Sequence, residues 1–150
     1  MCDPVRVTVK GVCVTETGDG VLAPVVIMED DGHRLIPLFV GLAEAISIHQ
    51  ALSGDISPRP TTHDLFISTL ERFNAKVTSV LIDDLDGGVY FARLEVSVDS
   101  DHREIDARPS DCMALALRSG APIHIKEEVM SEACVDKEDL GDLKEIGDYI

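Results

Sequence analysis

Hydrophobic and polar residues alternate along the first part of the chain, which predicts β-strands that are buried on one side. Over residues 5–14, valines occupy alternate positions at first, and Gly11 interrupts the pattern where we expect a bulge. Glycine-rich turns separate two further predicted strands, 21–28 and 35–40. Pro37 lies inside the last of these. Because proline cannot donate a hydrogen bond to a neighbouring strand, we expect an edge strand or a bulge there.

Helical spacing replaces this alternation at residues 42–52 and again from residue 62 to about 74. The second of these helices begins with a typical signal, because Thr61 and Asp64 have the spacing of a capping box. A hairpin and shorter elements follow. The remaining predictions are strands at 75–82, 89–98, 102–107 and 121–125, and one or two helical turns at 127–133.

The stretch 104–120 (EIDARPSDCMALALRSG) joins a charged strand to an apolar helix. Residues 112–117 carry no polar side chain, so this helix must be buried on nearly every side. We expect Ser110 to be its N-cap and Gly120 to end it. The polar entry is then held rigidly at the edge of the core, where a functional site would be well positioned.

Residues 33–54 follow the same plan as residues 102–120. In each, a His-Arg strand leads through a polar or glycine junction to an apolar helix that ends in Ser-Gly. This similarity indicates a duplicated strand–helix unit in which the two helices are counterparts.

These patterns predict one compact domain of the α+β class over residues 1–134. We expect a mixed β-sheet built from hairpins, with short helices packed on it. Residues 135–150 are acidic and only weakly periodic, so they are predicted to be an acidic C-terminal tail, either a docked helix or a frayed end.

The acidic composition is the strongest compositional signal, because 28 Asp and Glu against 13 Lys and Arg give a formal net charge of −15. Three interpretations are open: a surface suited to high salt, a surface that binds cations or basic partners and repels nucleic acid, or an ordinary acidic surface. The first, a halophilic protein, is favoured, because lysines and large aromatic residues are few. At high salt, net charge would say little about ligands, since long-range repulsion is screened.

Other compositional features narrow the class of protein. The four cysteines have no metal-ligand spacing, which favours free thiols in a reducing compartment. No apolar run reaches about 18 residues and no secretory leader is recognisable, so we predict neither a transmembrane helix nor a signal peptide. The expected location is cytoplasmic, without membrane association.

Candidate chemistry begins at the charged entry to the apolar helix. Asp106 and Arg108 would point to the same face of a strand, and Asp111 lies in the first helical turn, where the helix dipole favours an anion. In a structural interpretation, which the residues alone favour, Arg108 pairs with one of the two aspartates. In a functional interpretation, the two aspartates hold a divalent cation while Arg108 contacts a phosphate.

A second polar junction, residues 59–64 (RPTTHD), precedes the capped helix. A histidine in a first helical turn binds its proton less readily, so His63 suits the role of a neutral base or a ligand, with Asp64 orienting it. The alternative, which is favoured, is that Asp64 closes the capping box and His63 faces solvent. On the first helix, Glu44, Ser47, His49 and Gln50 interrupt the apolar surface, and an isolated histidine there is more often a core residue. The chain shows no Ser–His–Asp spacing, no phosphate-binding glycine loop and no basic patch.

Three segments are familiar: LIPLFVGLAEAISIHQAL, RPTTHDLFISTLERFNAKVTSVLIDDLDGGVYFARLEV and EIDARPSDCMALALRSGAPIHIKEEV. In this order and spacing they resemble the bifunctional nuclease domain family, over about residues 5–133. The resemblance implies a compact α+β domain that self-associates and that has nuclease activity on both RNA and DNA. The recurring polar positions of the family match Glu44, Arg59, Pro60, Thr62, His63, Asp64, Asp83, Arg93, Asp106, Arg108, Pro109, Ser110 and Asp111.

The first hypothesis is therefore a nuclease that hydrolyses phosphodiester bonds of RNA or DNA with low sequence preference. Mg²⁺ or Mn²⁺ would activate water and offset charge on the leaving oxygen. His63 would act as general base or acid. The expected metal ligands are Asp106 and Asp111 with Glu44 or Asp64; the catalytic residues are His63, Asp64, Asp106 and Asp111; and the phosphate-binding residues are Arg59 and Arg108.

The second hypothesis is a non-enzymatic, homo-oligomeric binding module, most simply a dimer, for an anionic ligand or a protein partner. Clustering in the structure discriminates between the two hypotheses. A nuclease would need its five key side chains in one open cleft, whereas an Arg108 buried in a closed ion pair would favour binding or structure. The five are Arg59, His63, Asp106, Arg108 and Asp111.

Overall fold

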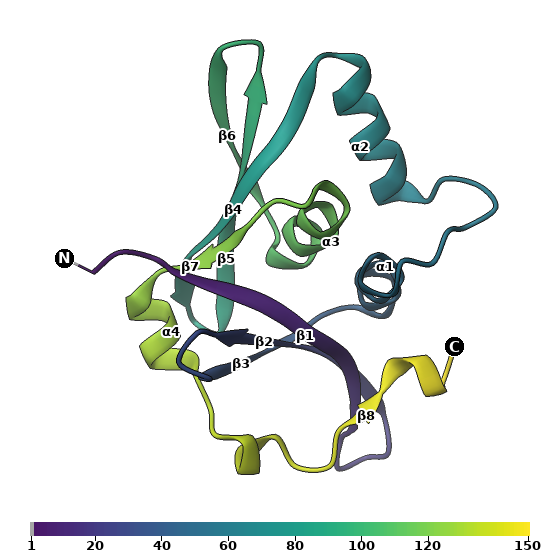
Figure 1. Cartoon of the computed structure of the whole chain (residues 1–150). Coiled ribbons are helices and arrows are strands. Elements are labelled where there is room, and N and C mark those ends of the chain that lie inside the picture. The colour runs from purple at the N-terminus through teal and green to yellow at the C-terminus, as the bar shows by residue number, and fades with distance from the viewer. Residues whose placement is uncertain (1) are drawn as a thin grey trace.

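Two three-stranded meanders, each followed by a helix, form the framework of the chain (Figure 1). The computed structural model describes residues 2–150. The first unit comprises β1 (Val5–Glu16), β2 (Leu22–Asp30), β3 (Leu35–Phe39) and α1 (Leu42–Ser53). The second comprises β4 (Ala75–Asp86), β5 (Val89–Val98), β6 (Asp101–Ala107) and α3 (Pro109–Ser119).

One mixed sheet of eight strands joins the two units. Its order is β3-β2-β1-β7-β4-β5-β6, with β8 paired to β1 outside this path. Strand β7 (Ile123–Ile125) lies at the junction, antiparallel to β1 and parallel to β4. The remaining elements are α2 (Thr62–Arg72), α4 (Glu127–Ala133), the 3₁₀ turns η1 (Lys137–Leu140) and η2 (Ile146–Asp148), and β8 (Lys144–Glu145). The α+β prediction with a mixed sheet is confirmed.

The strand order is symmetric about β7, which places β3 and β6 at its two ends. The duplication expected from the sequence therefore extends from one strand and a helix to three strands and a helix. Helices α1 and α3 pack against each other, α1 over β1 and β2, and α3 over β4 and β5. Each ends at a glycine in the left-handed region, Gly54 with φ 75° and Gly120 with φ 70°.

Several local predictions are confirmed. The pairing of β1 with β2 shifts register between Val9 and Gly11, as expected for a bulge. Pro37 lies in β3, at one end of the sheet order. Ser110, however, is not the N-cap of α3. Arg108 takes that position, because Pro109, which has no N–H, begins the helix where that donor would be unsatisfied.

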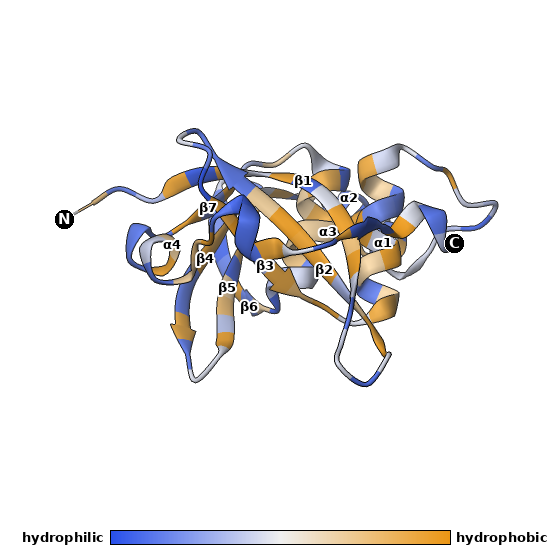
Figure 2. Cartoon of the chain, turned by 90° about the horizontal axis from the view of Figure 1, so that it is seen from below, coloured by the Kyte–Doolittle hydropathy of each residue, from blue (hydrophilic) through white to orange (hydrophobic). Residues whose placement is uncertain are grey.

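The apolar helix is buried as its sequence predicts. Residues 112–116 of α3 are each 3% exposed or less, between α1, α2 and the second meander. Figure 2 shows hydrophobic residues along the strands and helices, and hydrophilic residues in the connecting loops. Burial raises the pKa of the Cys112 thiol to about 12, so this cysteine is a packing residue rather than a nucleophile.

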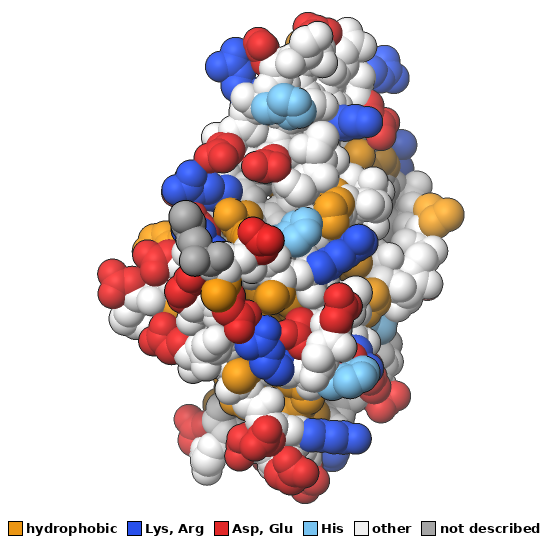
Figure 3. All heavy atoms as spheres, turned by 60° about the vertical axis from the view of Figure 1, so that its left-hand side comes forward, with side chains coloured by type: hydrophobic (Ala, Val, Ile, Leu, Met, Phe, Trp, Pro, Cys, Tyr) orange, Lys and Arg blue, Asp and Glu red, His pale blue; other side chains and the backbone are white. Residues whose placement is uncertain are grey.

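Acidic side chains are spread over the surface and mixed with basic ones, as the face in Figure 3 shows. Ion pairs hold part of this charge. One group joins Arg34 to Asp30 and Glu127 at 2.7 and 2.8 Å, which fastens α4 to the β2–β3 hairpin. No helix within residues 2–150 is long and apolar enough to cross a membrane.

The C-terminal segment, residues 135–150, packs on the rest of the fold. Strand β8 pairs with β1 at Cys13 and Val14, and Ile146 is only 1% exposed within the hydrophobic core. Gly147 lies against the ring of His49 on α1. The segment is therefore a docked strand and 3₁₀ turn, rather than the helix or frayed end expected from its weak periodicity.

This docking predicts a large effect at one buried position. The substitution Ile146→Ala leaves a cavity, so the free energy of unfolding should fall by about 2–5 kcal/mol in urea denaturation. Ile150→Ala is the matched control, because Ile150 is 58% exposed and its loss should change stability by less than about 0.5 kcal/mol. Equal effects at the two positions would contradict docking of the segment.

Candidate active site

The first turns of three helices converge on one pocket. Counted from their N-caps, Glu44 is the third residue of α1, His63 the second of α2 and Asp111 the third of α3. Their side chains line a pocket of about 440 Å³, which we call the helix-start pocket. Its other lining residues are Ala43, Ile46, Ser47, Gln50, Thr61, Thr62 and Arg108.

A chain of hydrogen bonds runs through this pocket from Ser47 to His63 to Asp111. The Ser47 Oγ lies 2.6 Å from His63 Nδ1, and His63 Nε2 lies 2.9 Å from Asp111 Oδ1. A carboxylate can only accept, so Nε2 carries the proton. In the neutral imidazole, Nδ1 then accepts a hydrogen bond from the Ser47 hydroxyl. We call this arrangement the Ser47–His63–Asp111 chain.

Arg108 closes one side of the helix-start pocket. Its Nε donates to Asp111 Oδ2 at 2.9 Å, and its terminal NH₂ donates to Glu44 Oε1 at 3.2 Å. Burial of Asp111 acts to raise the pKa of its carboxyl, but the hydrogen bonds from Arg108 and His63 outweigh burial and hold it below its usual value. Asp111 is therefore ionised at neutral pH. Arg108 itself keeps 65% of its side chain exposed, so it is paired but not buried.

Gly41 allows Glu44 to reach Arg108. The Glu44 carboxylate folds back over the start of α1, and a Cβ on Gly41 would collide with it. The chain has glycine at the N-cap of α1 where its counterpart helix has Arg108. The two helices thus place carboxylates at equivalent positions, Glu44 and Asp111, on either side of one guanidinium.

Asp64 lies next to His63 in the chain but performs a different task. One of its oxygens accepts from the Thr61 backbone N–H at 2.9 Å, which closes the predicted capping box. The other accepts from Arg118 Nε at 2.7 Å and so fastens α2 to α3. The Arg118 hydrogen bond, with help from Thr61, lowers the pKa of Asp64 to about 2. These contacts hold His63 in place through the helix that carries it.

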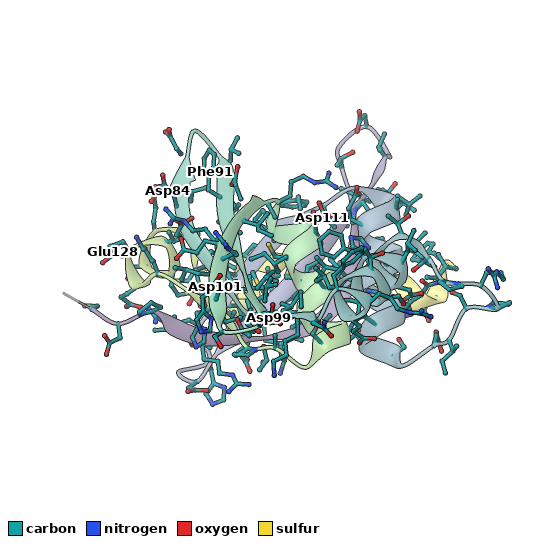
Figure 4. The ribbon with its side chains drawn as sticks, turned by 90° about the horizontal axis from the view of Figure 1, so that it is seen from above. Asp84, Phe91, Asp99, Asp101, Asp111 and Glu128 are labelled. Atoms are coloured by element: carbon teal, nitrogen blue, oxygen red, sulfur yellow. The ribbon has the colours of Figure 1, made fainter. Side chains whose placement is uncertain are left out.

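Besides Asp64, two predicted site residues do not line the helix-start pocket. Arg59 is exposed in the loop before α2 and makes no ion pair within residues 2–150. Asp106, on β6, lines a separate pocket of about 390 Å³ together with Asp84 and Phe91, which we call the sheet pocket. Figure 4 shows Asp84 and Phe91 on the β4–β5 hairpin, well apart from Asp111. Of the five residues that a nuclease cleft would need, three meet: His63, Arg108 and Asp111.

Ion pairs across neighbouring strands account for several of the charged side chains that line the sheet pocket. Arg93 of β5 donates to Asp83 of β4 at 2.8 Å and to Glu104 of β6 at 2.7 Å. Such cross-strand pairs stabilise a solvent-facing sheet surface modestly. The pocket contains no histidine, which is the side chain whose ordinary pKa lies closest to neutral pH.

The expected metal ligands do not form one site in this arrangement. Glu44 and Asp111 both bind Arg108, and Asp106 lines the other pocket. Within residues 2–150, no three His, Cys, Asp or Glu side chains are grouped so as to hold a metal ion. Use of Mg²⁺ or Mn²⁺ stays a prediction that a biochemical test must decide.

The sequence marks Ser47 as a polar residue on the apolar helix α1, but not as a site residue. It lies 16 positions before His63, and Asp111 follows 48 positions after, so no local motif joins them. The hydroxyl in an otherwise apolar helix is the one sequence signal for its role. In the structure Ser47 is 8% exposed, and a buried hydroxyl needs a hydrogen-bond partner.

Comparison of the sequence with known protein families gives a match. The model of the "bifunctional nuclease domain" matches residues 25–138, from within β2 to within η1. The chain belongs to the bifunctional nuclease domain family. All three helices of the pocket lie within the matched region, whereas β1, β8 and η2 lie outside it.

Relatives are found in Mycobacterium tuberculosis. Two proteins, from strains CDC 1551/Oshkosh and ATCC 25618/H37Rv, are each 36% identical to this chain over 111 residues. Both are described as uncharacterized. The match covers 73% of this chain and 66% of each relative, so it spans just under two thirds of the relatives' length.

The contacts of Asp64 predict a pH-dependent loss of stability. Its pKa of about 2 in the folded chain lies below the unfolded value of about 3.9, so its stabilisation is present above pH 3.9 and is lost as the pH falls through 2. Asp64→Asn should therefore lower the free energy of unfolding by about 1–2 kcal/mol at pH 7. The difference from the wild type should shrink between pH 4 and 2.

The control for this experiment is Asp101→Asn. Asp101 forms a 3.5 Å pair with Arg103 in which both side chains are more than two thirds exposed, so its removal should change little. If the Asp64 variant kept a constant deficit down to pH 2, the ionised carboxylate would not be the source of the stabilisation. Urea denaturation at each pH gives both values.

Proposed function

We propose that this protein is a nuclease that hydrolyses phosphodiester bonds in single-stranded RNA or DNA with low sequence preference, at the helix-start pocket. One observation carries the proposal. In a chain of the bifunctional nuclease domain family, His63 is held between two hydrogen-bond partners beside an exposed guanidinium, in an open pocket. A group for proton transfer and a group for phosphate binding are thus adjacent.

Arg108 is the phosphate-binding group of this proposal. Two of its N–H groups bind Asp111 and Glu44, and its others have no partner within residues 2–150. The starts of α1 and α3 add backbone N–H groups without side-chain caps. Helix N-termini carry partial positive charge and favour phosphate. This local field opposes the repulsion that an acidic protein exerts on a nucleic acid.

A neighbouring hollow offers a place for a base. Arg108 also lines a pocket of about 320 Å³ whose walls include Phe39, Val89 and Tyr90. Phe39 is 65% exposed and Val89 57% exposed. Exposed aromatic and apolar surface beside a phosphate site suits an unpaired base, because stacking does not depend strongly on base identity. This arrangement favours single-stranded substrates, with Arg59 available to contact the strand further along.

His63 moves the proton in the proposed reaction. Asp111 fixes the proton on Nε2 and stabilises the imidazolium that forms when Nδ1 accepts a second proton. Arg108 offsets negative charge that develops on the phosphate oxygens. The residues of the pocket can perform these steps themselves, and no step is assigned to a metal ion. Cleavage with and without Mg²⁺ or Mn²⁺ tests whether a metal ion takes part.

Two further expectations belong to the proposal. An acidic surface adapted to high salt predicts that nucleic-acid binding improves as salt screens the net charge of −15. Self-association, most simply as a dimer, is proposed from the family and can be measured by analytical ultracentrifugation.

Cleavage assays test the proposed site directly. Fluorescent single-stranded RNA and DNA are incubated with the protein across a salt series up to about 1 M. His63→Ala and Asp111→Asn should each lower kcat by about 10²–10⁴-fold, with the melting temperature nearly unchanged. Asp106→Asn in the sheet pocket is the matched control and should stay close to wild type. EDTA and added Mg²⁺ or Mn²⁺ decide whether a metal contributes.

The opposite effects of the Asp106 and Asp111 substitutions would place the active site elsewhere. If Asp106→Asn abolished cleavage and Asp111→Asn did not, the sheet pocket would hold the activity. If no condition gave cleavage while nucleotides still bound, the second candidate, a non-enzymatic binding module for an anionic ligand, would be favoured. The observation behind that candidate is that Arg108 already bridges two carboxylates, as in a structural network.

A further inference from the structure

Both ring nitrogens of His63 are occupied within the protein. Nε2 faces Asp111, and Nδ1 faces the hydroxyl of Ser47 at 2.6 Å. A water molecule or substrate hydroxyl therefore cannot reach the basic nitrogen without displacing Ser47. Ser47 and His63 both line the pocket, and the Ser47 Oγ is the group that faces Nδ1 there.

Ser47 also differs from two other helical hydroxyls of this chain. Thr69 in α2 donates to the carbonyl of Leu65 at 2.8 Å, and Ser119 at the end of α3 donates to the carbonyl of Leu115 at 2.9 Å. This bond to the preceding turn is the usual one for a hydroxyl inside a helix. Ser47 instead bonds across to His63 on another helix. Its hydroxyl is thus directed to the imidazole rather than used within its own helix.

We propose that Ser47 is a catalytic nucleophile, activated by His63 and Asp111, that attacks a phosphoester and forms a covalent seryl intermediate. This deepens the function proposed above and rests on it for the identity of the natural substrate. A serine is a weak nucleophile until an adjacent base accepts its proton and a third group orients that base. The Ser47–His63–Asp111 chain supplies all three parts, although its members come from three different helices.

The two half-reactions balance without any redox partner. In the first, the Ser47 Oγ–P bond forms, the P–O bond to one nucleotide breaks, and the hydroxyl proton passes to His63 Nδ1. That proton then passes, directly or through water, to the departing oxygen. In the second, water attacks the seryl phosphodiester and gives a proton to Nδ1, which returns it to the Ser47 oxygen as it leaves. One water is consumed for each bond cleaved.

Arg108 lies where this reaction needs positive charge. It binds the same carboxylate as His63 does, through the other oxygen, and most of its side chain is exposed at the pocket. Arg108 and Ser47 line the same pocket, and a guanidinium beside a bound phosphate would stabilise the added negative charge of the transition state.

A serine-directed phosphonofluoridate probe tests the nucleophile without knowledge of the natural substrate. Intact-mass and peptide mass spectrometry should show one adduct, on Ser47, in which the Oγ–P bond has replaced P–F and fluoride has left. Ser47→Ala should give no adduct, and His63→Ala should slow labelling by at least about 100-fold. Ser119→Ala is the matched control and should label at the wild-type rate.

Each outcome separates this proposal from the broader one. An adduct on Ser47 in a protein that cleaves no nucleic acid would support Ser47 as the nucleophile and would contradict the proposed nuclease activity. Cleavage that persists in Ser47→Ala would support the nuclease activity and would overturn the proposal that Ser47 is the nucleophile. Loss of cleavage in folded Ser47→Ala without any wild-type adduct would also overturn it, because Ser47 would then only orient His63. Circular dichroism and melting temperatures establish that each variant is folded.

Discussion

The hydrogen bond between His63 and Asp111 is the contact on which the candidate site depends. It joins the start of α2 to the start of α3, and Arg108 and Ser47 extend it to α1. Three helix N-termini must point at one place for this to occur. Their partial positive charges favour the carboxylates of Glu44 and Asp111 there, and the same charges favour an incoming phosphate.

The duplicated architecture explains how that convergence is built. Helices α1 and α3 are counterparts that pack against each other between the two meanders, and each places a carboxylate at its third position. Helix α2 has no counterpart in the repeat, and it brings the histidine. The site therefore lies where the two units meet, and the inserted helix completes it. The Asp64–Arg118 ion pair holds that helix against α3.

Most of the fold follows from the sequence, because hydrophobic periodicity, glycine stops and the capping box are local signals. The site was only half predictable for the same reason. His63, Arg108 and Asp111 lie at polar helix starts that are recognisable in the sequence, but Ser47 looks like an ordinary serine until the helices are packed. The sequence predicts Asp106 and Asp111 as ligands of one metal ion because they are close in the chain. The turn into α3 sends them to different pockets.

The docked C-terminal segment shows a similar limit. A single buried side chain, Ile146, and a two-residue strand fix it to the core, and neither produces a periodic pattern. The net charge of −15 is likewise a property of the whole surface, whereas the pocket is governed by one guanidinium and three helix starts. Global composition therefore says less about the ligand than these few contacts do.

The tautomer of His63 tests this account most directly. Long-range ¹H–¹⁵N NMR at a pH of about 8, where an ordinary imidazole is neutral, reports which ring nitrogen carries the proton. The Ser47–His63–Asp111 chain requires a protonated Nε2 and a bare Nδ1, with the ¹⁵N shifts of His63 changing in both Ser47→Ala and Asp111→Asn. A proton on Nδ1, or shifts that ignore both substitutions, would contradict the Ser47–His63–Asp111 chain.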